Sequence, residues 1–374
     1  DDSSRGLLLD LGALKSMGSI TSVPVTVQCG GNRRGHMNKK EKTSGISWGT
    51  GGISTGLFTG VRLNEVLGQH FGLKTPQDAE RMKVKHIVFH AKDGMSASVP
   101  IEHCLDPYGC PLLAWDMNGK PLSPEHGAPL RLVVPGQVGV RHVKWLTKIE
   151  ASSEEALGPW QRGIAYKGFP PSLKDFKDAK PELVPSMQKV PVQSVICFPA
   201  DGDSVRLAEP LPTSSSSAPS AGFFARFFGL GQSRPIDASN LEPEPTAPPT
   251  TYALTKSEKG EPCINVRGWA YSGGGNGIVR VDVSGDDGKT WHTATLKEGS
   301  EQPIHQAYAW TFWEIDLPLA DSYDSLKSST TRTIVCKALD ASYNVQPETV
   351  DAIWNARGLN NTAWHRVEVK LEEP

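Results

Sequence analysis

The hydrophobic pattern of the first half of the chain mixes strand and helix periods. Residues 23–29 alternate apolar and polar side chains and predict a buried strand, and further strands are predicted at 84–89, 130–134 and 143–149. Helical spacing is present at 7–18 and 61–67, while 45–60 is rich in glycine and threonine and predicts a loop. Since strands and helices follow no regular βαβ rhythm, we predict an α+β fold for this half.

The second half shows strand periods only. Val279, Val281 and Val283 share one face of a predicted strand at 278–283, and the turn at 285–289 leads into 290–296 as a hairpin. Another strand is predicted at 331–338. Short strands with turn signals between them predict a β-sandwich.

Two segments lack such patterns. A proline-rich hinge runs from 169 to 191, so we place the boundary between two domains at 187/188, giving 1–187 and 188–374. The serine- and proline-rich stretch at about 208–258 predicts a disordered insertion in a sandwich loop. Its apolar part, 223–230, is either a docking segment or a piece of loop with no role.

Composition removes several classes of function. The net charge is −2, from 39 basic and 41 acidic residues, so the bulk chain has no nucleic-acid or membrane-surface character. No apolar run reaches the roughly 18 residues of a spanning helix, and six scattered cysteines do not form a disulfide framework. The first residues lack a signal peptide and a methionine, and we expect a processed or truncated N-terminus.

Three familiar motifs do not fit their context. The G-x-S-x-G pattern occurs at 45–49 and 52–56, but no β-branched strand precedes either copy. The glycine-rich run 272–277 opens a strand and lacks the Lys-Ser/Thr of a phosphate loop, so a sandwich turn is the better interpretation. His86 and His90 are four apart on a strand, about 13 Å, which is too far for one zinc ion.

The remaining candidates are isolated polar residues. Cys29 ends the predicted strand of 23–29 and is followed by Arg33 and Arg34, which suits a thiophilic metal that handles an anion. The alternative is a buried cysteine before a turn. His126, Arg131 and the basic residues of 141–144 suit a phosphate-bearing cofactor, or are ordinary surface charges. Tyr166 and Arg357 have no local pattern that separates a role from a half-buried tyrosine or a surface arginine.

Taken together in sequence order, these segments carry a resemblance. Gln28–Arg34 resembles the cofactor-ligand motif of the sulfite oxidase family of molybdenum enzymes, and the match extends from about residue 23 to about 370, with only 208–258 foreign to it. The further matching motifs are Trp48, Met117–Gly119, His126–Gly127, Val133–Gly136, Arg141–Leu146, Tyr166–Phe169, Pro191–Ser194, Trp269–Gly275, Tyr343–Pro347, Trp354–Gly358 and Ala363–Val367.

The resemblance implies a role for each matching residue. Cys29 is expected to ligate molybdenum. The residues expected to hold the molybdopterin are Asp93, His126, Arg131, His142, Val143 and Lys144. Those expected to line the oxyanion pocket are Arg34, Trp48, Tyr166 and Arg357, the last from the second domain. The resemblance implies that 1–187 is the molybdopterin-binding catalytic domain and that 188–374 is an immunoglobulin-like β-sandwich that serves as the dimerisation domain. An arginine and a cofactor-binding stretch of the family lie upstream of the first residue of this chain, which again predicts truncation.

The resemblance also implies an activity. Arg141–Lys144 and Tyr166–Phe169 are similar to the sulfite branch rather than to assimilatory nitrate reductase, so we expect oxidation of sulfite to sulfate, with nitrate reduction or a non-catalytic member that has lost the cofactor as alternatives. The expected partners are oxygen or a cytochrome as electron acceptor and a second copy of the chain as a homodimer. The family suggests the mitochondrial intermembrane space or the peroxisome; the sequence itself leaves the compartment open.

Overall fold

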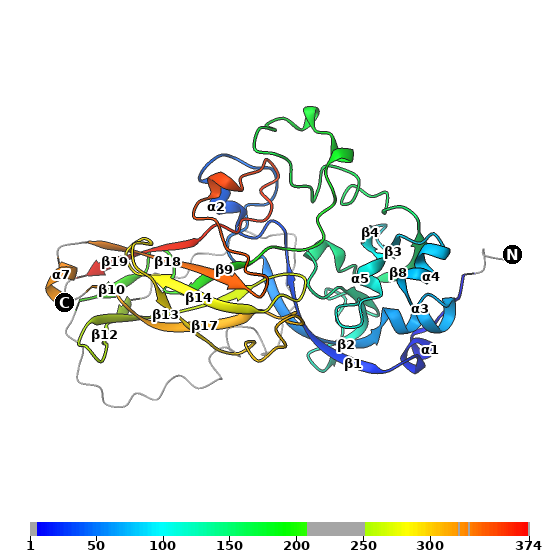
Figure 1. The fold of residues 1–374 in the computed structure, drawn as a ribbon, viewed down its shortest axis with the longest axis horizontal. Coiled ribbons are helices and arrows are strands. Elements are labelled where there is room, and N and C mark those ends of the chain that lie inside the picture. Colours follow the sequence, from blue (N-terminus) through cyan, green and yellow to red (C-terminus); the bar gives the residue numbers. More distant parts are fainter. Residues whose placement is uncertain (1–5, 208–250, 321, 328–329, 373–374) are drawn as a thin grey trace.

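The chain folds into two halves that lie side by side along the long axis of the molecule (Figure 1). The computed structural model describes residues 6–207, 251–320, 322–327 and 330–372. No helix among these residues combines the length and apolar character that crossing a bilayer requires.

The first half is built on two antiparallel sheets. In the larger one β1 (Ile20–Gln28) pairs with β2 (Ile53–Arg62), β2 pairs with β5 (Leu112–Met117), and β5 also contacts β6 (Lys120–Pro121) and β7 (Arg131–Val133). The smaller sheet has the order β4 (Ser96–Pro100), β3 (His86–Ala91), β8 (Leu146–Ser152). The short helices are α1 (Leu11–Ser16), α2 (Arg34–Asn38), α3 (Leu63–Phe71), α4 (Pro76–Arg81), α5 (Ile101–Cys104) and η1 (Gly139–Arg141).

Local chemistry sets the helix ends. Thr75 and Asp78 form a reciprocal capping box at the start of α4, and α3 ends at Gly72, whose φ of 64° is the left-handed conformation that glycine adopts without strain. The apolar faces of α3, α4 and α5 meet the two sheets in one core, which contains Leu63, Ile87 and Phe89. This packing fixes the ends of β1 and β7, where the candidate residues lie.

The second half is a two-layer sandwich. One sheet has the order β11 (Thr251–Ala253), β10 (Ser204–Arg206), β19 (His365–Glu372), β18 (Thr331–Asp340), β14 (Ile278–Ser284), β15 (His292–Thr293). The other has the order β12 (Thr255–Lys256), β13 (Pro262–Tyr271), β17 (Thr311–Pro318), β16 (Thr295–Leu296), with β9 (Gln193–Phe198) also on β13. Between the two halves lie η2 (Phe176–Asp178) and η3 (Pro181–Leu183), and the described part of the second half also contains α7 (Tyr323–Lys327) and η5 (Val350–Ala352).

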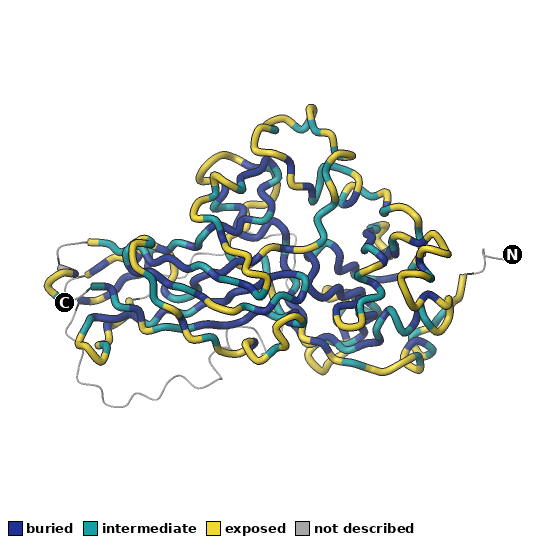
Figure 2. Tube along the Cα trace, in the orientation of Figure 1, coloured by how far each residue is buried: buried dark blue, intermediate teal, exposed yellow. Residues whose placement is uncertain are grey.

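The prediction of a mixed α+β half followed by a sandwich is confirmed. The inward faces of the two sandwich sheets enclose a core that includes Val281, Val283 and Trp313. Figure 2 shows buried segments in both halves. The glycine run 272–277 is a turn between β13 and β14, as expected.

Several predicted boundaries were wrong. Residues 53–60 are strand rather than loop, because they pair with the whole length of β1, and the helix predicted at 61–67 is α3, which starts two residues later. The strand predicted at 143–149 is β8, which begins after Trp145, whose φ is 50°. The helix predicted at 7–18 is limited to α1.

The second half required two corrections as well. Residues 290–296 cross from one sheet to the other, since β15 pairs with β14 whereas β16 pairs with β17. The insertion predicted at 208–258 ends earlier, because Thr251–Ala253 and Thr255–Lys256 are strands. Residues 208–250, including the apolar stretch 223–230, lie outside the described residues.

Candidate active site

Cys29 lies at the first position after β1, in a turn built from glycine. Its backbone N–H donates to the carbonyl of Gly52 at 2.8 Å, and its half-buried Sγ accepts from the N–H of Gly31 at 3.4 Å. A Cβ on Gly31 would lie 2.4 Å from Nη2 of Arg34, so only glycine lets this guanidinium fold back over the turn. The turn therefore holds a thiol and a cation close together.

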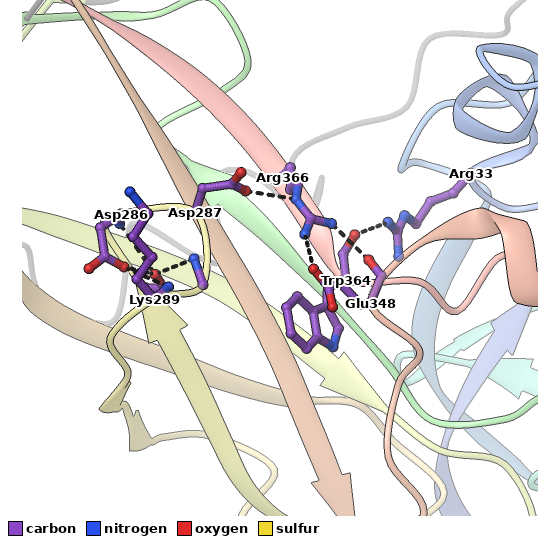
Figure 3. A network of polar contacts seen from close by, with 9 residues as sticks. Arg33, Asp286, Asp287, Lys289, Glu348, Trp364 and Arg366 are labelled. Carbon is purple, nitrogen blue, oxygen red and sulfur yellow. Dashed lines mark hydrogen bonds and ion pairs between the residues drawn. The ribbon is translucent and has the colours of Figure 1, made fainter.

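The two neighbouring arginines have different environments. Arg33 has a φ of 62° and is fully buried; it donates to the carbonyls of Ala363 at 2.8 Å and Trp364 at 3.2 Å. Figure 3 shows the contact of Arg33 with the Trp364 carbonyl, with Arg366 near the same residue. Burial lowers the pKa of Arg33 to about 10, so it stays charged at neutral pH. Arg33 thus ties the Cys29 turn to the sandwich.

Arg34, by contrast, shares its surroundings with Cys29. Its Nε donates to the carbonyl of Arg357 at 3.1 Å and its Nη1 to that of Ile46 at 2.7 Å. Burial and the charge of Arg357 lower the pKa of Arg34, whereas Cys29 and Tyr166 act to raise it. Burial likewise raises the pKa of Tyr166, which is within electrostatic range of Cys29, Arg34 and Arg357. Four residues from three segments of the chain are therefore brought together.

Arg357 completes this group from the second half. Its Nη1 donates to Oγ of Ser44 at 3.1 Å, while its buried Nε has no hydrogen-bond partner among the described residues. Gly358, at a φ of 58°, allows the close approach, because a Cβ there would lie 2.6 Å from Cγ of Arg34. An N–H that is buried and unpaired beside a thiol and a second guanidinium is suited to receive an oxyanion.

Trp48 borders this region through its backbone. Its carbonyl accepts from the N–H of Gly35 at 2.8 Å, and its own N–H donates to Ile46 at 2.9 Å. The side chain is 40 % exposed. The loop therefore holds the backbone of Trp48 against α2 while its ring remains open to solvent.

A second, cationic cluster lies at the end of β7. Nη1 of Arg131 donates to the carbonyl of His126 at 2.9 Å, and Nζ of Lys144 donates to that of Glu125 at 2.9 Å. Burial lowers the pKa of Arg131 to about 10, and its Nε is buried without a partner among the described residues. Burial also lowers the pKa of Lys144. Asp93 acts to raise this pKa, so the exposed carboxylate of Asp93 lies within electrostatic range of the Lys144 ammonium.

His142 and Val143 are internal to the protein. Nδ1 of His142 faces the N–H of Val134 at 3.3 Å and Nε2 the carbonyl of Gln137 at 3.2 Å, so the assigned tautomer carries its proton on Nε2. Burial lowers the pKa of His142 to about 3, which keeps it neutral. Val143 is fully buried. In the 142–144 run, the backbone and the Lys144 ammonium are the groups left to reach a cofactor.

Several residues that shape the site escaped sequence analysis. Ser44 and Asn361 carry no local signal, yet Ser44 holds Arg357 and Nδ2 of Asn361 donates to the carbonyl of Arg33 at 2.9 Å. Arg141 is fully buried rather than ligand-facing, and its Nη2 donates to the carbonyl of Met187 at 2.7 Å. Such contacts join residues far apart in sequence, so only the fold reveals them.

Two observations concern other parts of the molecule. Among the described residues no group of three His, Cys, Asp or Glu side chains is arranged to hold a metal ion. A cavity of about 700 Å³ lies at the 285–290 turn of the sandwich, lined by Asp286, Lys289 and Arg332 among others, and shares no residue with the group around Cys29.

Comparison with known proteins accounts for this arrangement. Residues 2–160 match the oxidoreductase molybdopterin binding domain, and residues 243–372 match the Mo-co oxidoreductase dimerisation domain. The chain is 31 % identical over 368 residues to a sulfite oxidase of Arabidopsis thaliana, a match that covers 94 % of this chain and 76 % of that protein. The chain belongs to the sulfite oxidase family. It is also 38 % identical over 355 residues to the mitochondrial sulfite oxidase of Rattus norvegicus, covering 93 % of this chain and 52 % of that protein.

Structural comparison supports the same fold for this sulfite oxidase family member. The sulfane dehydrogenase SoxCD from Paracoccus pantotrophus superimposes with a TM-score of 0.62 at 20 % identity, over 96 % of this chain and 71 % of that one. The chain spans about half the length of the mammalian relatives it matches. The molybdenum–molybdopterin cofactor predicted from the motifs is thus supported by the matching domain.

Proposed function

We propose that this chain oxidises sulfite to sulfate at a molybdenum–molybdopterin centre ligated by Cys29. The observation that carries the proposal is the meeting of Cys29, Arg34, Tyr166 and Arg357, since a soft thiolate and two guanidiniums beside it suit a metal site that handles an oxyanion. The relatives at 31 % and 38 % identity are named sulfite oxidases, so nitrate reduction is not proposed.

The two arginines would bind the substrate. Sulfite is an anion at neutral pH, present in singly and doubly charged forms, and moving it out of water is costly unless fixed cations meet it. Two unit charges 4 Å apart attract by about 4 kcal/mol at an effective dielectric of 20, so Arg34 and Arg357 together offset much of that cost. Their mutual repulsion, which lowers the pKa of Arg34, is relieved when a dianion lies between them.

Tyr166 and Trp48 would complete the pocket. Because burial raises the pKa of Tyr166, its hydroxyl keeps its proton at neutral pH and is available to donate a hydrogen bond to a substrate oxygen. Trp48 would provide a wall at the solvent side, consistent with its partly exposed ring.

The residues around β7 fit a phosphate-bearing cofactor. The buried, unpaired Nε of Arg131 and the ammonium of Lys144 are charged donors, and we propose that they bind the phosphate with the help of His126 and the backbone of 142–143. Asp93 would accept from the pterin. When bound, the cofactor supplies the oxygen-atom transfer and accepts two electrons. The protein binds and orients the anion and excludes water from it.

The proposal is tested on the purified protein. We expect about one molybdenum per chain, sulfite-dependent reduction of an added electron acceptor, and no reduction of nitrate by an added electron donor. Absence of molybdenum would instead support a non-catalytic member. Arg357→Gln should raise the sulfite KM strongly with little loss of stability. Arg366→Gln, the same substitution at a partly exposed arginine of the sandwich, should leave the sulfite KM unchanged. An unchanged KM in Arg357→Gln would argue against the pocket assignment.

We further propose that the chain divides at 187/188 and that its second part forms the homodimer, in line with the matched dimerisation domain. Oxygen or a cytochrome remains the predicted electron acceptor. Several relatives are named as mitochondrial, which supports that compartment as the first to examine and gives the peroxisome no support.

A further inference from the structure

The segment 170–184, here called the connector, lies against the candidate pocket from outside. It leaves the first half after Phe169, carries η2 and η3, and rises as the green loop at the top of Figure 1 beside α2 and the orange-red segment that precedes β19. Figure 2 shows it mostly exposed. Its residues are exposed or partly buried, so a side chain that contacts the pocket stands out.

Phe176 is one of these side chains. It is partly buried against the small apolar cluster of Met37, Trp354 and Ala356, which joins α2 to the second half. The guanidinium carbon of Arg357 lies 5.7 Å from the centroid of the Phe176 ring, within the range of a cation–π contact. The ring therefore contacts the cation that the second half contributes to the pocket.

Lys174 anchors the connector two residues earlier. Its Nζ lies 2.5 Å from Oε2 of Glu41 and 3.8 Å from the centroid of the Trp354 ring. Nε1 of Trp354 donates to the carbonyl of Glu41 at 2.9 Å. These contacts join three segments that are distant in sequence: the residues after α2, the connector, and the residues before Arg357. Phe176 lies two residues after Lys174.

Arg357 is held from several directions. Ser44 accepts from its Nη1, its carbonyl accepts from Arg34, and Phe176 lies over its guanidinium, while its Nε remains without a partner. We propose that Phe176 is a positioning residue that fixes the Arg357 guanidinium for binding a doubly charged oxyanion. The inference rests on the proposed function, because it assumes that Arg357 binds the substrate.

The direct test is Phe176→Leu in the full-length, molybdenum-loaded protein. Two quantities are measured: the sulfite KM and kcat, and the Kd for sulfate by calorimetry. Loss of a partly desolvated cation–π contact should raise both KM and Kd about three- to tenfold and leave kcat within about twofold. Phe176→Tyr keeps the aromatic face and should restore both constants.

The outcomes separate a positioning role from a structural one. Unchanged KM and Kd in Phe176→Leu, or a loss of kcat and molybdenum with unchanged KM, would overturn the proposal. If Phe176→Leu does not fold, Lys174→Met tests the same contact through its anchor: its KM should rise, whereas that of Lys177→Met, a matched change on an 88 % exposed lysine, should not. Equal values for the two lysine variants would then overturn it.

The sulfate measurement also separates this inference from the proposed function. If the wild-type protein binds sulfate but does not oxidise sulfite, the proposed function fails while the effect of Phe176 on the Kd can still be read. If sulfite is oxidised and the Phe176 variants behave as wild type, only the positioning role fails.

Discussion

Adjacent arginines in the Cys29 turn should give opposite phenotypes when substituted. Arg33→Met removes the donors to the Ala363 and Trp364 carbonyls. The Ala363 carbonyl keeps a weak donor, Nε2 of Gln346 at 3.4 Å, so most of the loss in stability comes from leaving the Trp364 carbonyl without its Arg33 donor. An unsatisfied buried group costs about 1–3 kcal/mol, and release of a buried charge offsets part of this, so the unfolding free energy should fall by about 1–2 kcal/mol.

Arg34→Met should behave differently. It also loses two bonds to carbonyls, but it removes the repulsion between Arg34 and Arg357, so we expect a stability loss of only about 1 kcal/mol together with a large rise in sulfite KM. The assay is urea unfolding of both variants, followed by sulfite kinetics on the folded fraction. Wild-type stability with impaired sulfite binding in Arg33→Met would refute the structural role assigned to Arg33.

Three further predictions concern pH and packing. His142 has a folded-state pKa of about 3 against 6.5 in the unfolded chain. Its contribution to folding stability is therefore complete above pH 6.5 and is lost as the pH falls towards 3, by about 2 kcal/mol at pH 5. His142→Asn should flatten this part of a stability–pH curve, and an unaltered slope would contradict the assignment. Gly60→Ala places a Cβ 2.1 Å from the Leu113 carbonyl and should lower stability by about 3 kcal/mol in urea unfolding, whereas Gly168→Ala, with nothing within 4 Å, serves as the control. Ser44→Ala should raise the sulfite KM a few-fold by releasing Nη1 of Arg357, with Ser322→Ala, on the far end of the sandwich, unchanged.

The fold class was readable from the sequence because its signals are local. The valine alternation of β14 and the turn at 285–289 predict a sandwich hairpin without tertiary information. Residues 53–60 were misassigned for the opposite reason: Gly56 and Gly60 have weak strand propensity, and pairing with β1 and β5 overrides it. The strand is thus determined by partners elsewhere in the chain.

The candidate site was predictable only through its motifs. Cys29 and Arg34 stand out beside glycine in one short segment, but nothing local distinguishes Arg34 from Arg33, whose left-handed backbone turns it to the sandwich. Arg357 reaches the first half only because 354–358 packs on α2. Ser44 and Phe176 act through that packing, which no periodicity encodes.

The most direct test of a site centred on residue 29 is Cys29→Ser. The change replaces a soft sulfur ligand by a hard hydroxyl of similar size, so the variant should unfold at the same urea concentration as wild type and show no sulfite turnover. Sulfite turnover at the wild-type rate in this variant would contradict the account.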